Sequence, residues 1–244
     1  MYFFDDSSNI ESLENSPDST TIHDCFPYDR MTTQPETSLA SLLSADAIVR
    51  LHDHSTAAWH DQDNRQTIPP DGTFLKLVQA QHLANLELWH IEDRARTPQA
   101  SDHELAEVKR AVDRTNQRRN DVAEQCDILL LATLEPYKLP SPTAELHSES
   151  PGLMLDRLSI LALKIFHTQE EIARLNAPQG HSERNRKRLQ ILEAQRADLA
   201  GCLDRLWQQT IHGERRFKLY RQLKMYNDPS LNPAVYGKGS NKPG

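Results

Sequence analysis

Apolar residues recur every three or four positions along most of this chain, a spacing that places them on one face of an α-helix. The repeat predicts five helices, at residues 39–62, 74–96, 101–134, 151–175 and 183–226. A composition of 37% hydrophobic residues with only 8 glycines favours helices over a sheet with many turns. We therefore expect an all-α protein, an antiparallel up-and-down helical bundle.

Two of the helix starts carry specific capping signals. Ser101 and Glu104 have the spacing of a capping box, in which the serine accepts from the Glu104 amide and the glutamate reaches back. Ser150 followed by Pro151 predicts a second start, because a proline at the first helical position needs no N–H. Pro136 ends the helix that begins at Ser101.

The last two predicted helices form a pair. The helix at 151–175 is apolar almost all round through Phe166, which predicts a central, buried helix. A short turn at 176–182 joins it to the fifth and longest helix, whose apolar seam alternates by three and four residues and continues through Gly213 and Phe217. This pattern predicts a long C-terminal coiled-coil-like hairpin.

Composition divides the chain into three parts. Residues 1–38 are rich in Ser, Thr, Asp and Pro without periodicity, and we expect a disordered acidic extension there. Residues 39–236 are expected to form a single helical-bundle domain and residues 237–244 a flexible tail. Of the total net charge of −7, residues 1–71 carry −10, from three basic and thirteen acidic residues, which leaves +3 for the rest.

Several classes of protein do not fit this composition. The three cysteines lie far apart, which matches neither a disulfide framework nor a zinc spacing, so we expect a reducing compartment. The acidic start does not resemble a signal peptide, and no stretch has the about 20 apolar residues of a membrane span. We therefore expect a cytoplasmic protein without membrane contact.

Basic residues cluster at residues 184–188 and again at 215–224. Because the body of the protein is only mildly positive, electrostatic binding of nucleic acid is not favoured. We interpret both clusters as solvated helix faces.

One arginine interrupts the apolar stripe of the helix at 101–134. At about 100° per residue, Arg119 points the same way as Val108 and Cys126. A guanidinium stays charged, and a buried charge is costly unless it is paired. Arg119 therefore needs a carboxylate from another helix, with Asp93 and Asp156 as the leading candidates, or it faces an anionic ligand.

The candidate ligand-binding residues lie on three of the predicted helices. They are Asp93, Asn116, Arg119, Asn120, Asp156, Arg157 and His167. The arginines and asparagines offer many donors to a phosphate or carboxylate. Asp156 and His167 are suited to acid–base chemistry, but about 16 Å of helix separates them, so they cannot act on the same atom. Whether the protein is an enzyme stays open.

Two patterns match metal motifs only in part. Glu87-x-x-His90 is half of the signature of di-iron bundles, which needs a second such pair. The acidic pairs at 104–107 and 124–127 mimic the magnesium motif of helical pyrophosphatases, but they lie about 30 Å apart on one helix. We therefore expect neither a metal nor a cofactor.

A short internal echo links two of the predicted helices. The same spacing occurs in His52, Trp59 and His60 and, thirty residues later, in His82, Trp89 and His90. Two similar helices lying side by side would explain the echo, and so would a chance match.

Four stretches together resemble a known family. They are LWHIEDRAR (88–96), NQRRND (116–121), SESPGLMLDRLSILALKIFH (148–167) and KLYRQLKMYNDPSLNP (218–233). In this order, over about residues 40–236, the chain resembles the bacterial family known as domain of unknown function 4254. The resemblance implies a helical bacterial protein without an established activity, and a link to envelope-sugar metabolism.

Two functions follow as hypotheses. The first is binding of a small anionic ligand, phosphate- or carboxylate-bearing, in a polar pocket of the bundle. It predicts a closed polar cavity that holds Asp93, Arg119, Asn120 and Asp156. The alternative is a non-catalytic scaffold that binds a protein partner or a second copy through the hairpin. It predicts that the polar side chains satisfy one another and that an apolar strip is exposed along the fifth helix. We favour the pocket.

Overall fold

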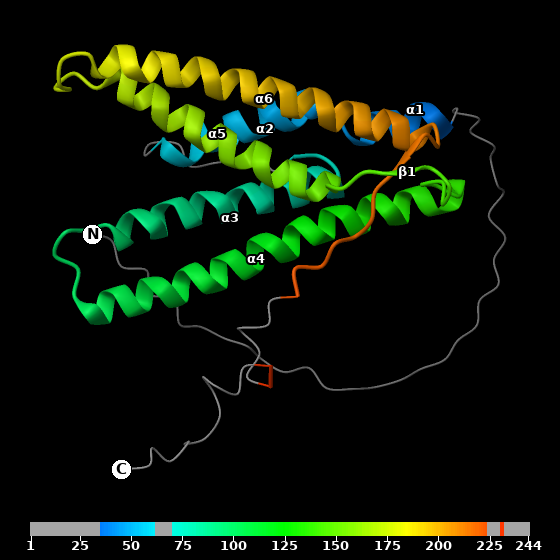
Figure 1. The fold of residues 1–244 in the computed structure, drawn as a ribbon, viewed down its shortest axis with the longest axis horizontal. Helices are drawn as coiled ribbons and strands as arrows, with labels where there is room; N and C mark the ends of the chain where they lie inside the picture. Colours follow the sequence, from blue (N-terminus) through cyan, green and yellow to red (C-terminus); the bar gives the residue numbers. More distant parts are fainter. Residues whose placement is uncertain (1–34, 62–69, 224–229, 232–244) are drawn as a thin grey trace. The chain divides into compact units, whose positions relative to one another are not determined.

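The computed structural model describes residues 35–61, 70–223 and 230–231, and this part of the chain is mostly helical (Figure 1). Its helices are α1 (Pro35–Leu42), α2 (Ala45–His60), α3 (Thr73–Ala95), α4 (Asp102–Leu134), α5 (Pro151–Ala173) and α6 (His181–Ile211). The described residues also include a 3-10 turn and two short strands, η1 (Glu135–Tyr137), β1 (Glu145–Leu146) and β2 (Arg215–Arg216). The predicted all-α class is confirmed.

The helix α5 occupies the centre of the packing. It contacts α2, α3, α4 and α6, with α2 and α6 on one side of it and α3 and α4 on the other (Figure 1). Its Leu155, Leu158 and Leu163 are buried in the core. The Trp207 indole N–H of α6 donates to the Leu39 carbonyl oxygen at 3.0 Å and so ties α1 to the same core.

The segment 39–62, predicted as one helix, is divided between α1 and α2. Ser44 has extended backbone, and its hydroxyl accepts the Ala47 amide N–H at 3.4 Å, which makes it the N-cap of α2. The Asp204 carboxylate of α6 accepts the neighbouring amide N–H of Ala45 at 2.8 Å. Local capping and a contact from a distant helix together interrupt the helix.

Helix α1 begins four residues before residue 39, where the helical-bundle domain was predicted to begin. The first helix begins at Pro35, inside the segment 1–38 that was expected to be disordered. Residues 1–34 and 237–244, to which the predictions of disorder and of a flexible tail also apply, lie outside the described residues.

The fifth predicted helix is shorter than expected, and α4, not α6, is the longest helix of the described residues. Helix α6 ends at Ile211 because Gly213 has a φ of +75° and the Glu214 amide N–H donates to the Gln209 carbonyl oxygen at 2.8 Å. This Schellman arrangement ends helices and favours glycine, which adopts a positive φ without strain. The chain beyond it forms β2, which pairs in parallel with β1, and Phe217 is buried in the core.

The start of α5 lies in close contact with α4. Ser150 occupies the predicted N-cap position, but its hydroxyl donates to the buried Asp127 carboxylate. Asp127 accepts the Gly152 amide N–H at 2.7 Å and thereby caps α5 from another helix. A side chain at Gly152 has no room, since a Cβ there would lie 2.3 Å from the Ala123 carbonyl oxygen.

Replacing Gly152 with alanine should lower the free energy of unfolding by about 1–3 kcal/mol, because overpacking forces the backbones apart. Gly201 on α6 is the matched control: the nearest atom to a Cβ there is the flexible end of Arg205, at 3.9 Å. Gly201→Ala should raise the free energy of unfolding by up to about 1 kcal/mol through helix propensity. Urea denaturation followed by circular dichroism measures both, and equal midpoints would contradict the close approach.

Candidate functional site

Arg119 lies partly buried on α4 and faces α5. Its Nε is 3.7 Å from Oδ1 of Asp156, so Asp156 is the carboxylate partner. Asp93 is exposed instead and pairs with Arg96 at 3.8 Å. Arg119 was expected to be buried. The Arg119 and Asp156 side chains are 24% and 17% exposed, so the pair is only partly shielded from water.

The Asp156 carboxylate joins α5 to α3. It accepts from the side-chain amide of Asn85 at 3.0 Å and from that of Gln81. The Asn85 amide also donates to the Ser159 hydroxyl at 2.9 Å. The charge of Asp156 is therefore balanced inside the protein, as a carboxylate shielded from water requires.

His82 extends this network to α2. Its Nδ1 lies 2.7 Å from the Ser159 hydroxyl and its Nε2 lies 2.8 Å from the Thr56 hydroxyl. Because the Thr56 hydroxyl donates to the His52 carbonyl oxygen at 2.8 Å, it accepts from Nε2–H of His82, and Nδ1 accepts from Ser159. Burial lowers the pKa of His82 to about 4, so the ring is neutral at neutral pH.

The internal echo of the sequence corresponds to two histidine contacts between α2 and α3. The ring centroids of His52 and His82 are 4.5 Å apart, and those of His60 and His90 are 5.6 Å apart. The His60 ring also lies 5.1 Å from that of His167 on α5. The histidines of the echo therefore lie side by side on α2 and α3.

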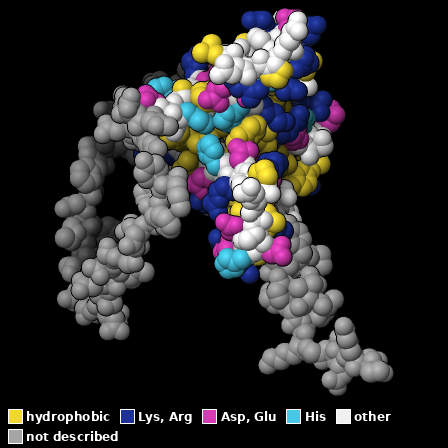
Figure 2. Space-filling view, turned by 90° about the vertical axis from the view of Figure 1, so that its left-hand side faces the viewer, with side chains coloured by type: hydrophobic (Ala, Val, Ile, Leu, Met, Phe, Trp, Pro, Cys, Tyr) yellow, Lys and Arg dark blue, Asp and Glu magenta, His cyan; other side chains and the backbone are white. Residues whose placement is uncertain are grey.

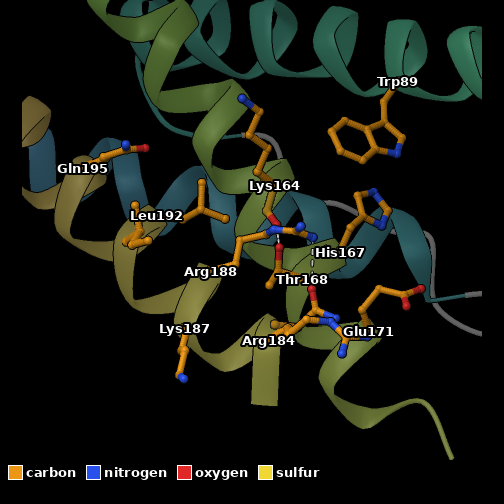
Figure 3. A pocket seen from close by; sticks show the side chains of 12 residues that line it. Trp89, Lys164, His167, Thr168, Glu171, Arg184, Lys187, Arg188, Leu192 and Gln195 are labelled. Carbon is orange, nitrogen blue, oxygen red and sulfur yellow. Dashed lines mark hydrogen bonds between the residues drawn. The ribbon is translucent and has the colours of Figure 1, made fainter. Parts of the chain in front are cut away.

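A cleft of about 750 Å³ runs along α5 and α6 beside Trp89 of α3 (Figure 3). We call it the basic cleft, and it is lined by Trp89, Lys164, His167, Thr168, Glu171, Arg184, Asn185, Lys187, Arg188, Ile191, Leu192 and Gln195. One wall is an aromatic stack, in which the His167 and Trp89 rings lie 4.6 Å apart with 13° between their planes. The basic cleft is open, and it is a different site from the closed cavity that was predicted around Arg119, which does not line it.

The lining of the basic cleft includes two lysines, two arginines and a single carboxylate. That carboxylate, Glu171, already contacts Arg174 at 3.3 Å and His181 at 2.7 Å. Lys187 lies 3.8 Å from Glu183 and points away from the other side chains in Figure 3. The other three cations are Lys164, Arg184 and Arg188. None of them has a described carboxylate within ion-pair distance.

Arg188 reaches across the basic cleft from α6. Figure 3 shows its guanidinium beside Thr168 and His167 of α5. One of its N–H groups donates to the Asn185 side-chain oxygen at 3.0 Å, which orients the guanidinium. Since a guanidinium has five N–H donors, most of them remain available to a ligand. Figure 2 shows Lys and Arg side chains gathered over the α5–α6 end of the molecule, with histidines beside them.

The candidate residues predicted from the sequence are distributed over separate clefts. His167 lines the basic cleft. Arg119 and Asp93 line a second cleft of about 380 Å³, the Arg119 cleft. The complete lining of the Arg119 cleft is Asn85, Leu88, Trp89, Glu92, Asp93, Arg96, Arg119, Ile160 and Leu163.

The remaining candidates lie elsewhere. Arg157 is exposed, lines a third cleft of about 670 Å³ and pairs with Glu149 at 2.8 Å. Asn116 and Asn120 are partly buried on α4 and line none of these three clefts. The structure therefore does not gather the predicted residues into one polar pocket.

Three cations and Trp89 in the basic cleft are absent from the sequence-based candidates. The cluster at 184–188 was interpreted as a solvated face, yet Arg184 and Arg188 face the cleft. Their four-residue spacing, which puts both on one side of a helix, is the signal that was available. That Lys164 lies opposite them follows only from the packing of α5 against α6.

Among the residues that the structure describes, no group of three or more His, Cys, Asp or Glu side chains is arranged to hold a metal ion. None of the described helices combines the length and the apolar character needed to cross a membrane.

Comparison with known protein families identifies one match. The model of the family described as "Protein of unknown function (DUF4254)" matches residues 75–219, which is more than half of the chain. The match confirms the family resemblance over a shorter span than the expected 40–236, and it includes every residue of the basic cleft. No curated protein and no solved structure matches the chain.

Arg119→Met should lower the free energy of unfolding by about 1–3 kcal/mol, because it removes the cation nearest to a partly shielded carboxylate. Arg118→Met is the control, since Arg118 is exposed and pairs with Glu87 on the surface, where such pairs contribute about 0–1 kcal/mol. Urea midpoints that shift equally in the two variants would contradict the role assigned to Arg119.

Acid should destabilise the protein through His82. The pKa is about 4 in the folded protein and 6.5 ordinarily, so the unfolded chain binds more protons, and stability is lost as pH falls from 6.5 towards 4. The difference between these two pKa values corresponds to about 3 kcal/mol of unfolding free energy. Unfolding measured at pH 7 and 4.5 should show a smaller loss in His82→Gln than in the native protein. His54→Gln, exposed on α2, should lose as much as the native protein, and an equal loss in all three would refute the assignment.

Proposed function

The chain belongs to the DUF4254 family, and we propose that it binds a small anionic ligand, bearing a phosphate or a carboxylate, in the basic cleft. The observation that carries this proposal is the presence of Lys164, Arg184 and Arg188 around one cleft without a described carboxylate partner. Such a group of cations produces a positive potential that concentrates anions in the cleft. Each lining residue lies within the segment matched by the family model.

The types of donor favour a phosphate over a carboxylate. Arg184 and Arg188 offer planar guanidinium groups from successive turns of α6. One guanidinium group can donate two parallel hydrogen bonds to two oxygens of a phosphate. Lys164 adds a compact charge from α5. A phosphate dianion balances more of this charge than a single carboxylate does.

The aromatic wall of the basic cleft suits the part of the ligand that is attached to the anion. Binding sites for small molecules combine apolar walls with a few polar groups that set orientation. Trp89 supplies such a wall, and His167 stacked against it is oriented by a 2.7 Å contact between its Nδ1 and the Glu170 carboxylate.

A scaffold that binds a protein partner or a second copy through a coiled-coil-like α5–α6 hairpin is the alternative function. It requires an exposed apolar strip along α6. Among the described residues of α6, Ile191 is the one exposed large hydrophobic side chain, and a single such residue is ordinary for a protein surface. The ligand proposal therefore has the stronger support.

Thermal-shift measurements and calorimetry with inorganic phosphate, sugar phosphates, nucleotides and carboxylates test the proposal. Sugar phosphates belong in the panel because the family resemblance implies a link to envelope-sugar metabolism. A ligand at one hundred times its Kd stabilises the folded state by about 2.7 kcal/mol. The Tm should then rise by several degrees.

Arg188→Ala should weaken binding of that ligand by about tenfold to a hundredfold, since a hydrogen bond to a charged group contributes about 1.5–3 kcal/mol. Arg186→Ala is the matched control on the same helix, because Arg186 lies 3.8 Å from Glu183 and does not line the cleft. Equal loss of affinity in both variants would refute the assigned site. If no anion of the panel raises the Tm, the proposed function is wrong.

A further inference from the structure

The basic cleft and the Arg119 cleft are neighbours. Trp89 lines both of them. On α5, Ile160 and Leu163 line the Arg119 cleft, and Lys164 and His167, one turn further along, line the basic cleft. The positions 160, 163, 164 and 167 fall on one side of a helix and extend over about 10 Å. A single ligand that occupies both clefts therefore needs about this length.

The Arg119 cleft has no excess charge, in contrast to the basic cleft. Arg96 pairs with Glu92 at 3.3 Å and with Asp93 at 3.8 Å, and Arg119 pairs with Asp156. Its apolar lining consists of Leu88, Trp89, Ile160 and Leu163. A neutral group with an apolar surface fits this lining better than a second ion does.

The polar side chains of the Arg119 cleft include donors and acceptors. The Arg96 and Arg119 guanidinium groups donate, and the Glu92 and Asp93 carboxylates accept. Nε of Arg119 is buried and makes no hydrogen bond among the described residues, since its ion-pair partner, Oδ1 of Asp156, lies 3.7 Å away. A hydroxyl group both donates and accepts, so it matches this mixed set of groups better than an alkyl chain does.

We infer that the anionic ligand of the basic cleft carries an uncharged, hydroxylated ring that occupies the Arg119 cleft. One face of the ring packs against Trp89 and Leu88, and its hydroxyl groups contact the polar side chains at the edge. The inference rests on the proposed function, because it assigns the second part of the same ligand. The cleft volume of about 380 Å³ is sufficient for one substituted six-membered ring.

Calorimetry on the full chain tests the inference with inorganic phosphate, cyclohexyl phosphate, glucose 1-phosphate, glucose 6-phosphate and mannose 1-phosphate. At least one hexose phosphate should bind about tenfold tighter than inorganic phosphate and cyclohexyl phosphate. Leu88→Trp fills the Arg119 cleft and should remove this advantage while the Kd of inorganic phosphate stays unchanged. Leu83→Trp, exposed on the same helix and outside the three clefts, should keep the advantage.

Asp93→Ala alters an exposed side chain of the cleft and serves as the second variant if Leu88→Trp does not fold; it should reduce the advantage. Binding of inorganic phosphate without any preference for a hexose phosphate would overturn the inference and leave the proposed function intact. If cyclohexyl phosphate binds as tightly as the best hexose phosphate, the ring need not be hydroxylated and that part of the inference is refuted. If the hexose phosphate keeps its tighter binding in folded Leu88→Trp or Asp93→Ala, the ring does not occupy the Arg119 cleft. Failure of every phosphate to bind would refute the proposed function, and the inference with it.

Discussion

The arrangement of α3, α4 and α5 depends on the contacts of one carboxylate, that of Asp156. It belongs to α5, lies 3.7 Å from Arg119 of α4 and accepts a hydrogen bond from Asn85 of α3 at 3.0 Å. A partly shielded charge is costly unless its partners stay in place. Sliding one helix along another would separate these groups, so the polar contacts define the register that apolar packing alone leaves less specific.

This register also builds the candidate site. Asn85 and Trp89 are one turn apart on α3, and Ser159 and His167 are about two turns apart on α5. Because Asn85 donates to Ser159 at 2.9 Å, the two helices are aligned so that the Trp89 and His167 rings stack at 4.6 Å. The aromatic wall of the basic cleft thus follows these polar contacts by one turn on α3 and by about two turns on α5.

The total charge of the chain says little about the potential at the basic cleft. The chain carries −7 overall, yet three of the cations that line this cleft have no described carboxylate partner. Acidic side chains elsewhere on the helices are occupied by local pairs, such as Glu183 with Arg186 and Lys187. The potential that a ligand meets is set by the nearest unpaired charges, because more distant charges are screened by solvent and salt.

The sequence by itself determined the features that depend on neighbouring residues. The capping box at Ser101 and the helix start at Pro151 are where they were predicted, and Arg119 was identified as a cation that needs a partner. The end of α6 at Gly213 also had a local signal, but the continuing apolar repeat concealed it. Only the tertiary structure decided that Asp156 pairs with Arg119 and that the cluster at 184–188 meets Lys164 across a cleft. These contacts join residues far apart in the chain, and helical periodicity specifies which side of a helix a residue occupies but not which helix lies opposite.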